Sequence, residues 1–440
     1  MPRSVKTLIA VFLLGLQVSA MSGASLLSAA ERPEVELKWR AKVIPIGFST
    51  SLFTQASNIK QGTDAVAALK RSLRVWEEAA GIEFREFITD KQSVSPTNGG
   101  DGVSLITIAA TADNALLFAR NGAEVAATTR LFYDPRGRIT EADVVLNPYK
   151  QFSTDGTFGT FDLEATFTHE IGHVLGLEHS FIRGSAMFES FGINGLFGLH
   201  GFSQRHLSVA DLTAVRAKYG VRGEEENCCG TVNVRLLFPE RGPAANVNLW
   251  LEETETGRLA AQATTGTDGN VVIPGLRYGS YTVYTERKQR AKRSVQSQMI
   301  GKISISDEAP ATLVKRLSAG NDEIEVEYTG FNGQLTFNSV PINAGKAYTL
   351  YVGGRNLDSK SVSIRFSTPF LELTPGSISF LDYGEGLTVL SFEVSASHEI
   401  PVGEYSVFLE TPSGGRSSIP GAIAVRDFVN PYSNLILQNK

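Results

Sequence analysis

Residues 169–179 combine histidines and a glutamate in a spacing that is typical of a catalytic zinc site. The segment reads His-Glu-Ile-Gly-His-Val-Leu-Gly-Leu-Glu-His. His169 and His173 would project from one face of a helix, because they lie four residues apart. Gly176 predicts an exit from that helix, since glycine accepts the left-handed conformation, and the turn would bring back His179 as third ligand. Three protein ligands leave one tetrahedral position open for water, as in catalytic zinc sites.

Glu170 directly follows the first predicted ligand, and its position predicts a general base. A zinc ion bound by the three histidines would polarise a substrate carbonyl and lower the pKa of its water towards neutrality. Glu170 could then take a proton from that water and later pass it to a leaving amine. We therefore predict Glu170 as the catalytic residue and His169, His173 and His179 as metal ligands.

The segment 168–180 resembles the active-site helix of the matrixins, a family of metzincin zinc metalloproteases. Ser180 after the third histidine is the matrixin choice, and Met187 stands where metzincins place the methionine turn beneath the metal. The segments 137–147 and 207–220 are similar to a strand and a closing helix of bacterial matrixin-like proteins, so the likeness covers about residues 36–220. It implies an α+β catalytic domain with a twisted mixed sheet, and metalloendopeptidase activity on protein or peptide substrates.

The resemblance also carries expectations about metals and regulation. Matrixins with a second, structural zinc use histidines upstream of the active-site helix, and none precedes it here. We therefore expect one catalytic zinc and no structural zinc. Asp143, Asn147 and Asp155 are candidate ligands of a Ca²⁺ ion. No cysteine precedes the helix either, so we expect no latency through a cysteine that occupies the zinc.

Substrate contacts are predicted from the segments on either side of the helix. An extended peptide would add to an edge strand, for which residues 125–131 are the candidate. The segment 188–202 would wall the pocket for the residue after the scissile bond. Its apolar side chains predict a preference for an apolar residue there; they include Phe191, Ile193, Leu196 and Phe197.

The amino-terminal residues 1–30 read as a secretory signal peptide, which predicts a secreted, extracellular protein. Arg3 and Lys6 precede an apolar run from Thr7 to Leu16, and small residues follow. An uncleaved anchor is the alternative, but the run is short for a bilayer. After signal removal we expect no membrane span. The formal net charge of −5 gives no reason to expect a nucleic-acid partner.

The 440 residues predict several domains. Periodic apolar residues predict helices over 64–80, 162–175 and 208–219, and strands over 43–48, 82–87, 102–108 and 142–146. We place the catalytic domain at 31–220, a charged linker at 221–229, and two all-β sandwiches after it. Residues 230–316 resemble a transthyretin-like or carboxypeptidase-regulatory-like sandwich, and residues 317–440 an immunoglobulin-like sandwich with a tail.

Neither β domain carries a catalytic constellation, so cell-surface or matrix contact is the role we expect for them. The adjacent Cys228 and Cys229 could form a vicinal disulfide or a partner-linked thiol, or serve the linker. The basic run 287–293 reads as a solvated loop, with a polyanion or cell-wall contact as the alternative. The competing hypothesis for the whole chain is an extracellular adhesin or binding protein whose metzincin-like domain is inactive.

Overall fold

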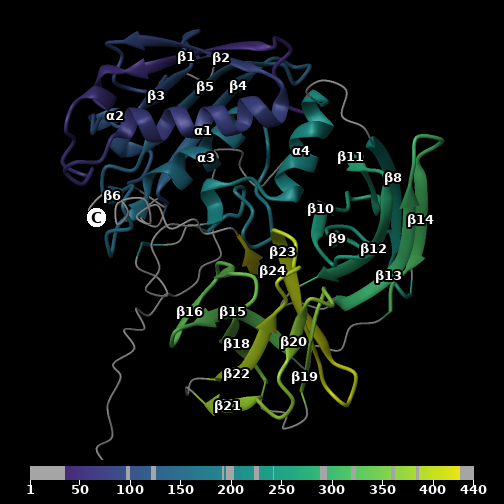
Figure 1. Cartoon of the computed structure of the whole chain (residues 1–440). Coiled ribbons are helices and arrows are strands. Elements are labelled where there is room, and N and C mark those ends of the chain that lie inside the picture. Colours follow the sequence, from purple (N-terminus) through teal and green to yellow (C-terminus); the bar gives the residue numbers. More distant parts are fainter. Residues whose placement is uncertain are drawn as a thin grey trace, which may run out of the picture.

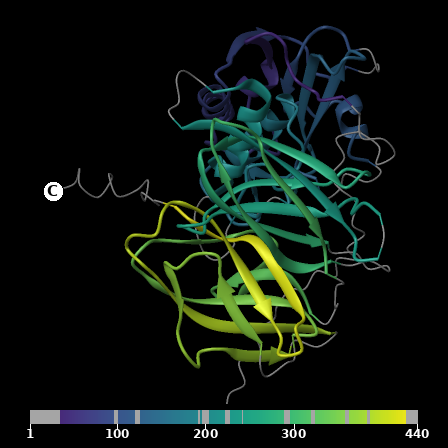
Figure 2. The same cartoon turned by 90° about the vertical axis from the view of Figure 1, so that its right-hand side faces the viewer.

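The computed structural model describes residues 35–95, 100–119, 125–190, 193–194, 203–221, 227–240, 242–287, 295–318, 324–357, 362–382 and 386–426. Figure 1 shows a helix-and-sheet domain at the top, one β domain beside it and a second β domain below both. The turned view in Figure 2 shows the three stacked along the molecule. The predicted multidomain fold class, an α+β domain followed by two all-β sandwiches, is thus confirmed. The predicted signal peptide lies outside the described residues.

The amino-terminal domain is built on a twisted mixed sheet. Its strands are β1 (Val43–Ser49), β2 (Glu83–Thr89), β3 (Leu105–Thr107), β4 (Ala127–Tyr133) and β5 (Ile139–Leu146), in the order β2-β1-β3-β5-β4. β4 pairs antiparallel with β5, while the other pairs are parallel. β4 therefore lies at the edge of the sheet, which is where the sequence placed its candidate edge strand. The short strands β6 (Phe152–Ser153) and β7 (Phe161–Asp162) pair beside it.

Helices cover this sheet and begin and end at the residues that the sequence indicated. α1 (Ala65–Ala80) starts at the Asp64 side chain, which accepts from the Ala67 amide, and ends at Gly81 in the left-handed conformation. α3 (Leu163–Val174) crosses α1, and α4 (Val209–Tyr219) begins with a capping box made by Ser208 and Asp211. A short helix, α2 (Ala112–Leu116), and the 3₁₀ turns η1 (Thr50–Phe53) and η3 (Ser203–Arg205) complete the domain.

The first β domain consists of two facing sheets. One has the order β10-β9-β12-β13 and the other β11-β8-β14. The strands are β8 (Cys228–Leu237), β9 (Asn248–Glu253), β10 (Leu259–Thr264), β11 (Asn270–Arg277), β12 (Gly279–Arg287), β13 (Val295–Ile305) and β14 (Ala311–Arg316). Cys228 and Cys229 are joined by a disulfide and start β8. They belong to the domain and not to the linker, because Cys228 pairs with Arg277 of β11.

The second β domain also packs two sheets face to face. Their orders are β16-β15-β18-β22-β20, with β21 also on β22, and β17-β24-β23-β19. The strands are β15 (Glu325–Phe331), β16 (Gln334–Thr336), β17 (Val340–Ile342), β18 (Ala347–Arg355), β19 (Ser363–Phe366), β20 (Leu371–Leu373), β21 (Ser379–Asp382), β22 (Leu387–Ala396), β23 (Gly403–Glu410) and β24 (Arg416–Val425). No helix among the described residues is long and apolar enough to cross a membrane.

The three domains meet at a shared junction. α4 packs on β10 and β11, where the Thr213 hydroxyl donates to the Ala260 carbonyl at 2.8 Å. The two β domains meet through an aromatic stack in which the Tyr284 ring lies 5.6 Å from Trp250 and 4.9 Å from Phe408. The Glu252 carboxyl at this junction is buried, and it accepts hydrogen bonds from the Trp250 indole and from the Ser406 hydroxyl across the interface.

Glu252 predicts a pH dependence of stability. Burial raises its pKa from 4.5 to about 7 in the folded protein. Between these values the unfolded chain ionises while the folded one does not, so this contribution is full below pH 4.5 and is lost as the pH rises through 7. We expect Glu252→Gln, which keeps both acceptor bonds, to remove this pH dependence. It amounts to a change on the order of 3 kcal/mol in the free energy of unfolding between low and high pH. Melting temperatures of both proteins between pH 4.5 and 8 would test this; parallel curves would contradict it.

Candidate metal centre

Helix α3, which carries His169 and His173, is fixed at its start by a buried carboxylate. Asp162 is the N-cap, and its side chain accepts from the Ala165 amide at 2.9 Å. The Arg205 guanidinium also donates to both carboxylate oxygens, through Nε at 3.0 Å and Nη2 at 2.5 Å. A carboxylate at a helix N-terminus is favourable because unpaired amides and the helix dipole meet it there. The start of the helix is thereby tied to the η3 segment.

The end of α3 turns sharply at Gly176. This residue has φ +78°, and its amide donates to the His173 carbonyl while the Leu177 amide donates to Gly172. That pair of bonds is the Schellman ending of a helix. A Cβ at Gly176 would lie 2.4 Å from the Leu37 carbonyl oxygen, so the position excludes larger residues on two grounds. The predicted exit from the helix is confirmed, and the turn carries His179 back towards His169 and His173.

The three histidines converge. Their ligand atoms all lie within 4.8 Å of one another. Among the described residues, this is the group of histidine, cysteine or acidic side chains that could hold a metal ion. The Nδ1 atom of His169 faces the Ala186 carbonyl and that of His173 faces the Leu177 carbonyl, both at 2.8 Å. A carbonyl oxygen only accepts, so each Nδ1 carries the proton and each Nε2 presents its lone pair. The two Nε2 atoms face each other at 3.0 Å.

The electrostatic surroundings keep these imidazoles neutral. Burial, reinforced by the neighbouring histidines, lowers the pKa of His169 well below its usual value and that of His173 to about 3. Burial also lowers the pKa of His179. Neutral imidazole is the form that binds metals, and outer carbonyls that hold Nδ1–H orient such ligands. The donor set therefore fits a zinc ion held by three histidine nitrogens.

Met187 lies against the same helix. It is buried, and a Cβ on Gly172 would come within 2.2 Å of its Sδ, so the glycine makes room for the thioether. The loop that joins His179 to Met187 closes on itself, because the Ser180 amide donates to the Met187 carbonyl at 2.7 Å. Met187 thus packs beneath the helix that carries His169 and His173.

Glu170 has a partner that the sequence gave no reason to single out. The Thr129 hydroxyl, on edge strand β4, lies 2.5 Å from Glu170 Oε2. Both residues are buried, and burial raises the pKa of Glu170 to about 7 while the Thr129 hydrogen bond opposes the rise. A threonine in a strand forty residues earlier in the chain carries no local signal. Only the antiparallel pairing of β4 with β5 brings it under the helix.

The remaining predicted site residues are placed as follows. Ile193 is exposed and forms an isolated β-bridge with Phe161, whereas Phe191, Leu196 and Phe197 lie outside the described residues. The candidate calcium ligands have protein partners: Asp143 accepts from the amides of Ser95 and Leu105. Asn147 accepts from the Tyr149 amide, and Asp155 pairs with Lys60. The calcium site stays a prediction.

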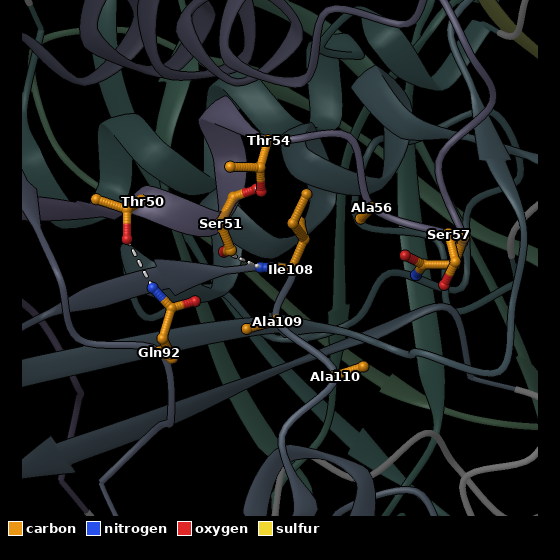
Figure 3. Close-up of a pocket in the computed structure, with 10 residues that line it drawn as sticks. Thr50, Ser51, Thr54, Ala56, Ser57, Gln92, Ile108, Ala109 and Ala110 are labelled. Carbon is orange, nitrogen blue, oxygen red and sulfur yellow. Dashed lines mark hydrogen bonds between the residues drawn. The ribbon is translucent and has the colours of Figure 1, made fainter.

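A pocket of about 420 Å³ opens elsewhere on this domain, where β1 and β3 end. Figure 3 shows its hydroxyl-rich lining, in which Thr50 bonds Gln92 and Ser51 bonds the Ile108 amide. Its lining carries no titratable side chain and none of the three histidines. The side chains that could bind a metal therefore lie at the histidine cluster and not in this pocket.

Residues 38–220 match the matrixin family model, peptidase M10. That match supports a zinc metalloprotease, and the histidine triad is compatible with it. A search of curated proteins found no match.

Solved structures align with low similarity. BcpA, the major pilin subunit of Bacillus cereus, is 11% identical over 43% of this chain and 67% of its own, with a TM-score of 0.19. A Bacteroides ovatus glucan-utilization protein, SGBP-B, is 11% identical over 44% and 43%, with a TM-score of 0.16. A marsupial T cell receptor is 10% identical over 45% and 73%, also at 0.16. Likenesses at these scores carry no argument.

The histidine geometry predicts zinc binding that single substitutions remove. We expect one zinc per chain, and a loss of affinity of more than about 100-fold in His173→Ala or His179→Ala, which exceeds the usual effect of losing an outer hydrogen-bond partner. His206→Ala, which removes an exposed histidine from outside the cluster, is the matched control. Competition with a chromogenic chelator measures the affinity. Equal affinities in all four proteins would refute the assignment.

Proposed function

We propose that this chain, whose residues 38–220 match the matrixin model, is a secreted zinc metalloendopeptidase that hydrolyses peptide bonds in proteins. The observation that carries the proposal is the convergence of three neutral imidazoles, together with a buried carboxylate at the residue that follows the first of them. His169, His173 and His179 would hold the metal through nitrogen atoms. Zinc, when bound, supplies a Lewis acid that polarises a carbonyl and makes water a nucleophile near neutral pH.

Glu170 would act as the general base and then as the general acid of the reaction. Its carboxylate receives a proton from water as the peptide carbonyl is attacked, and returns it to the leaving amine. The Thr129 hydroxyl restricts the side-chain torsions of Glu170 by holding one carboxyl oxygen at 2.5 Å. The other oxygen, Oε1, is left for water, so Thr129 would set the direction from which Glu170 works.

The edge strand β4 would align the substrate. Its inner side pairs with β5, and no strand among the described residues pairs with its outer side. An extended peptide could add there through main-chain hydrogen bonds, which give affinity without demanding a sequence. Thr129 belongs to this strand, so the same element would hold the substrate and the base. An apolar residue after the scissile bond stays our proposal for specificity, with Ile193 as the described member of that wall.

The proposal predicts proteolysis that depends on zinc and on Glu170. We expect the chain without residues 1–30 to cleave casein, and a chelator to abolish cleavage. Glu170→Gln should lose at least about 100-fold in kcat, the scale of general acid–base catalysis, while it still binds one zinc. Rates and zinc content measured on the same samples test this. A wild type that is loaded with zinc but inert on many unfolded proteins would favour the binding-protein hypothesis.

The Thr129 contact predicts a defect in kcat and not in substrate binding. Thr129→Val keeps the shape and removes the hydroxyl, so kcat should fall roughly 10- to 100-fold while KM changes little. Thr129→Ser keeps the hydroxyl and should recover most of the rate. Steady-state kinetics on a short quenched peptide would separate the two parameters. Wild-type kcat in Thr129→Val would show that Glu170 needs no such partner.

A further inference from the structure

The loop between the third histidine and Met187 reaches into the junction of the two β domains. Ile182 in this loop is fully buried, and it packs in one cluster with Trp250 and Tyr284 of the first β domain and Phe408 of the second. The Phe181 ring also meets Trp250 edge to face, at 6.4 Å between centroids. The loop therefore completes an apolar core to which all three domains contribute.

Polar contacts fix the next residue of the loop, Arg183, to the second β domain. The Arg183 amide donates to the Pro420 carbonyl at 3.1 Å, and its guanidinium Nη2 donates to the Glu327 carbonyl at 2.5 Å. Arg183 is buried, with an exposed fraction of only 8%, so these bonds form away from water. Gly184 and Gly421 allow close approach here: a Cβ on Gly421 would lie 2.2 Å from the Arg183 carbonyl oxygen.

The fixed loop is connected to a metal ligand within a few residues. Ser185 and Ala186 follow, and both bind the Asp211 carboxylate, through the Ser185 hydroxyl at 2.6 Å and the Ala186 amide at 2.8 Å. The Ala186 carbonyl then accepts the Nδ1 proton of His169 at 2.8 Å. A displacement of Arg183 would therefore change the direction of the peptide that orients the first histidine.

We propose that the two β domains hold this loop in place and thereby set the geometry of the metal centre, with Arg183 as a positioning residue. The inference deepens the proposed function, on which it rests, because it gives the β domains a part in the same site. Accessory domains that served only for attachment would need no contact with the loop. Here the contact is buried, and it includes a charged side chain whose removal from water is costly unless it is bonded.

A pair of glycines in the β domains provides a matched test in the full chain. Gly421→Ala would place a methyl against the Arg183 carbonyl, at a φ of +71°. Gly269→Ala would place one 2.5 Å from the Leu236 carbonyl oxygen, at a φ of +73°, inside the first β domain and against no residue of the loop. Both variants carry the same backbone strain and the same type of clash, so they should lower the melting temperature alike.

The expected difference between the two variants lies in the metal centre. Gly421→Ala should weaken zinc binding by about tenfold or more, the scale for outer partners of ligands, and Gly269→Ala should not. The visible absorption of cobalt(II) in place of zinc, which reports ligand geometry, should change in Gly421→Ala alone. Equal zinc affinities and equal cobalt spectra in both variants would overturn the proposal.

Arg183 substitutions test the same device without a backbone change. Arg183→Met keeps the apolar length and removes the donors, and Arg183→Lys keeps a positive donor. We expect zinc affinity and kcat to fall in Arg183→Met, with partial recovery in Arg183→Lys and little change in KM. Wild-type zinc affinity in Arg183→Met would overturn the proposal. The metal readouts need no activity, so an inert wild type would refute the proposed function and leave this test intact.

Discussion

The Nδ1 protons of His169 and His173 are each held by a main-chain carbonyl, and the chemistry of the metal centre depends on this constraint. If either proton moved to Nε2, the lone pair would point at a carbonyl oxygen and the nitrogen facing the cluster could no longer bind a cation. The Leu177 carbonyl, four residues after His173, is set by the helix end at Gly176. The Ala186 carbonyl is set by the loop before Met187.

The contacts that hold these two carbonyls differ in range. The Leu177 support is local, because the Schellman turn needs only Gly176 and the preceding turn of helix. The Ala186 support draws on Asp211 of α4, and through Arg183 on the second β domain. One ligand is therefore oriented by its own helix, while the other is oriented by packing between domains. The geometry of the histidine cluster therefore depends on both local and tertiary structure.

The local half of this arrangement could be predicted from the sequence. The helix limits follow from Asp64, Gly81 and Ser208, because caps and stops act on neighbouring residues. The convergence of the three histidines follows from a spacing of four and a glycine exit. The strand expected at 102–108 is longer than β3, since Val103 and Ile108 are also apolar and no local rule ends the pattern at Leu105 and Thr107.

The contacts that depend on tertiary structure have no comparable signal in the sequence. Thr129 lies far along the chain from Glu170, and its role arises from the register of an antiparallel edge strand. Asp211 forms a capping box with Ser208 in the structure, and the same carboxylate also binds Ser185 and Ala186. Arg183 reads as an ordinary surface cation until the β domains are packed around it. Functional roles that depend on long-range pairing need the fold before they can be recognised.

The domain junction adds a physical reason for a single arrangement of the three domains. Apolar contacts such as those of Ile182 and Phe408 favour association but tolerate sliding, because the hydrophobic effect has no direction. Buried polar groups do not tolerate it: Arg183, Glu252 and Glu286 each meet partners from another domain. A shift of a few ångströms would leave each of them buried without its partner, at a cost of roughly 1–3 kcal/mol or more apiece. Directional contacts of this kind fix the position of the loop between His179 and Met187. They thereby fix the direction of the Ala186 carbonyl that faces His169.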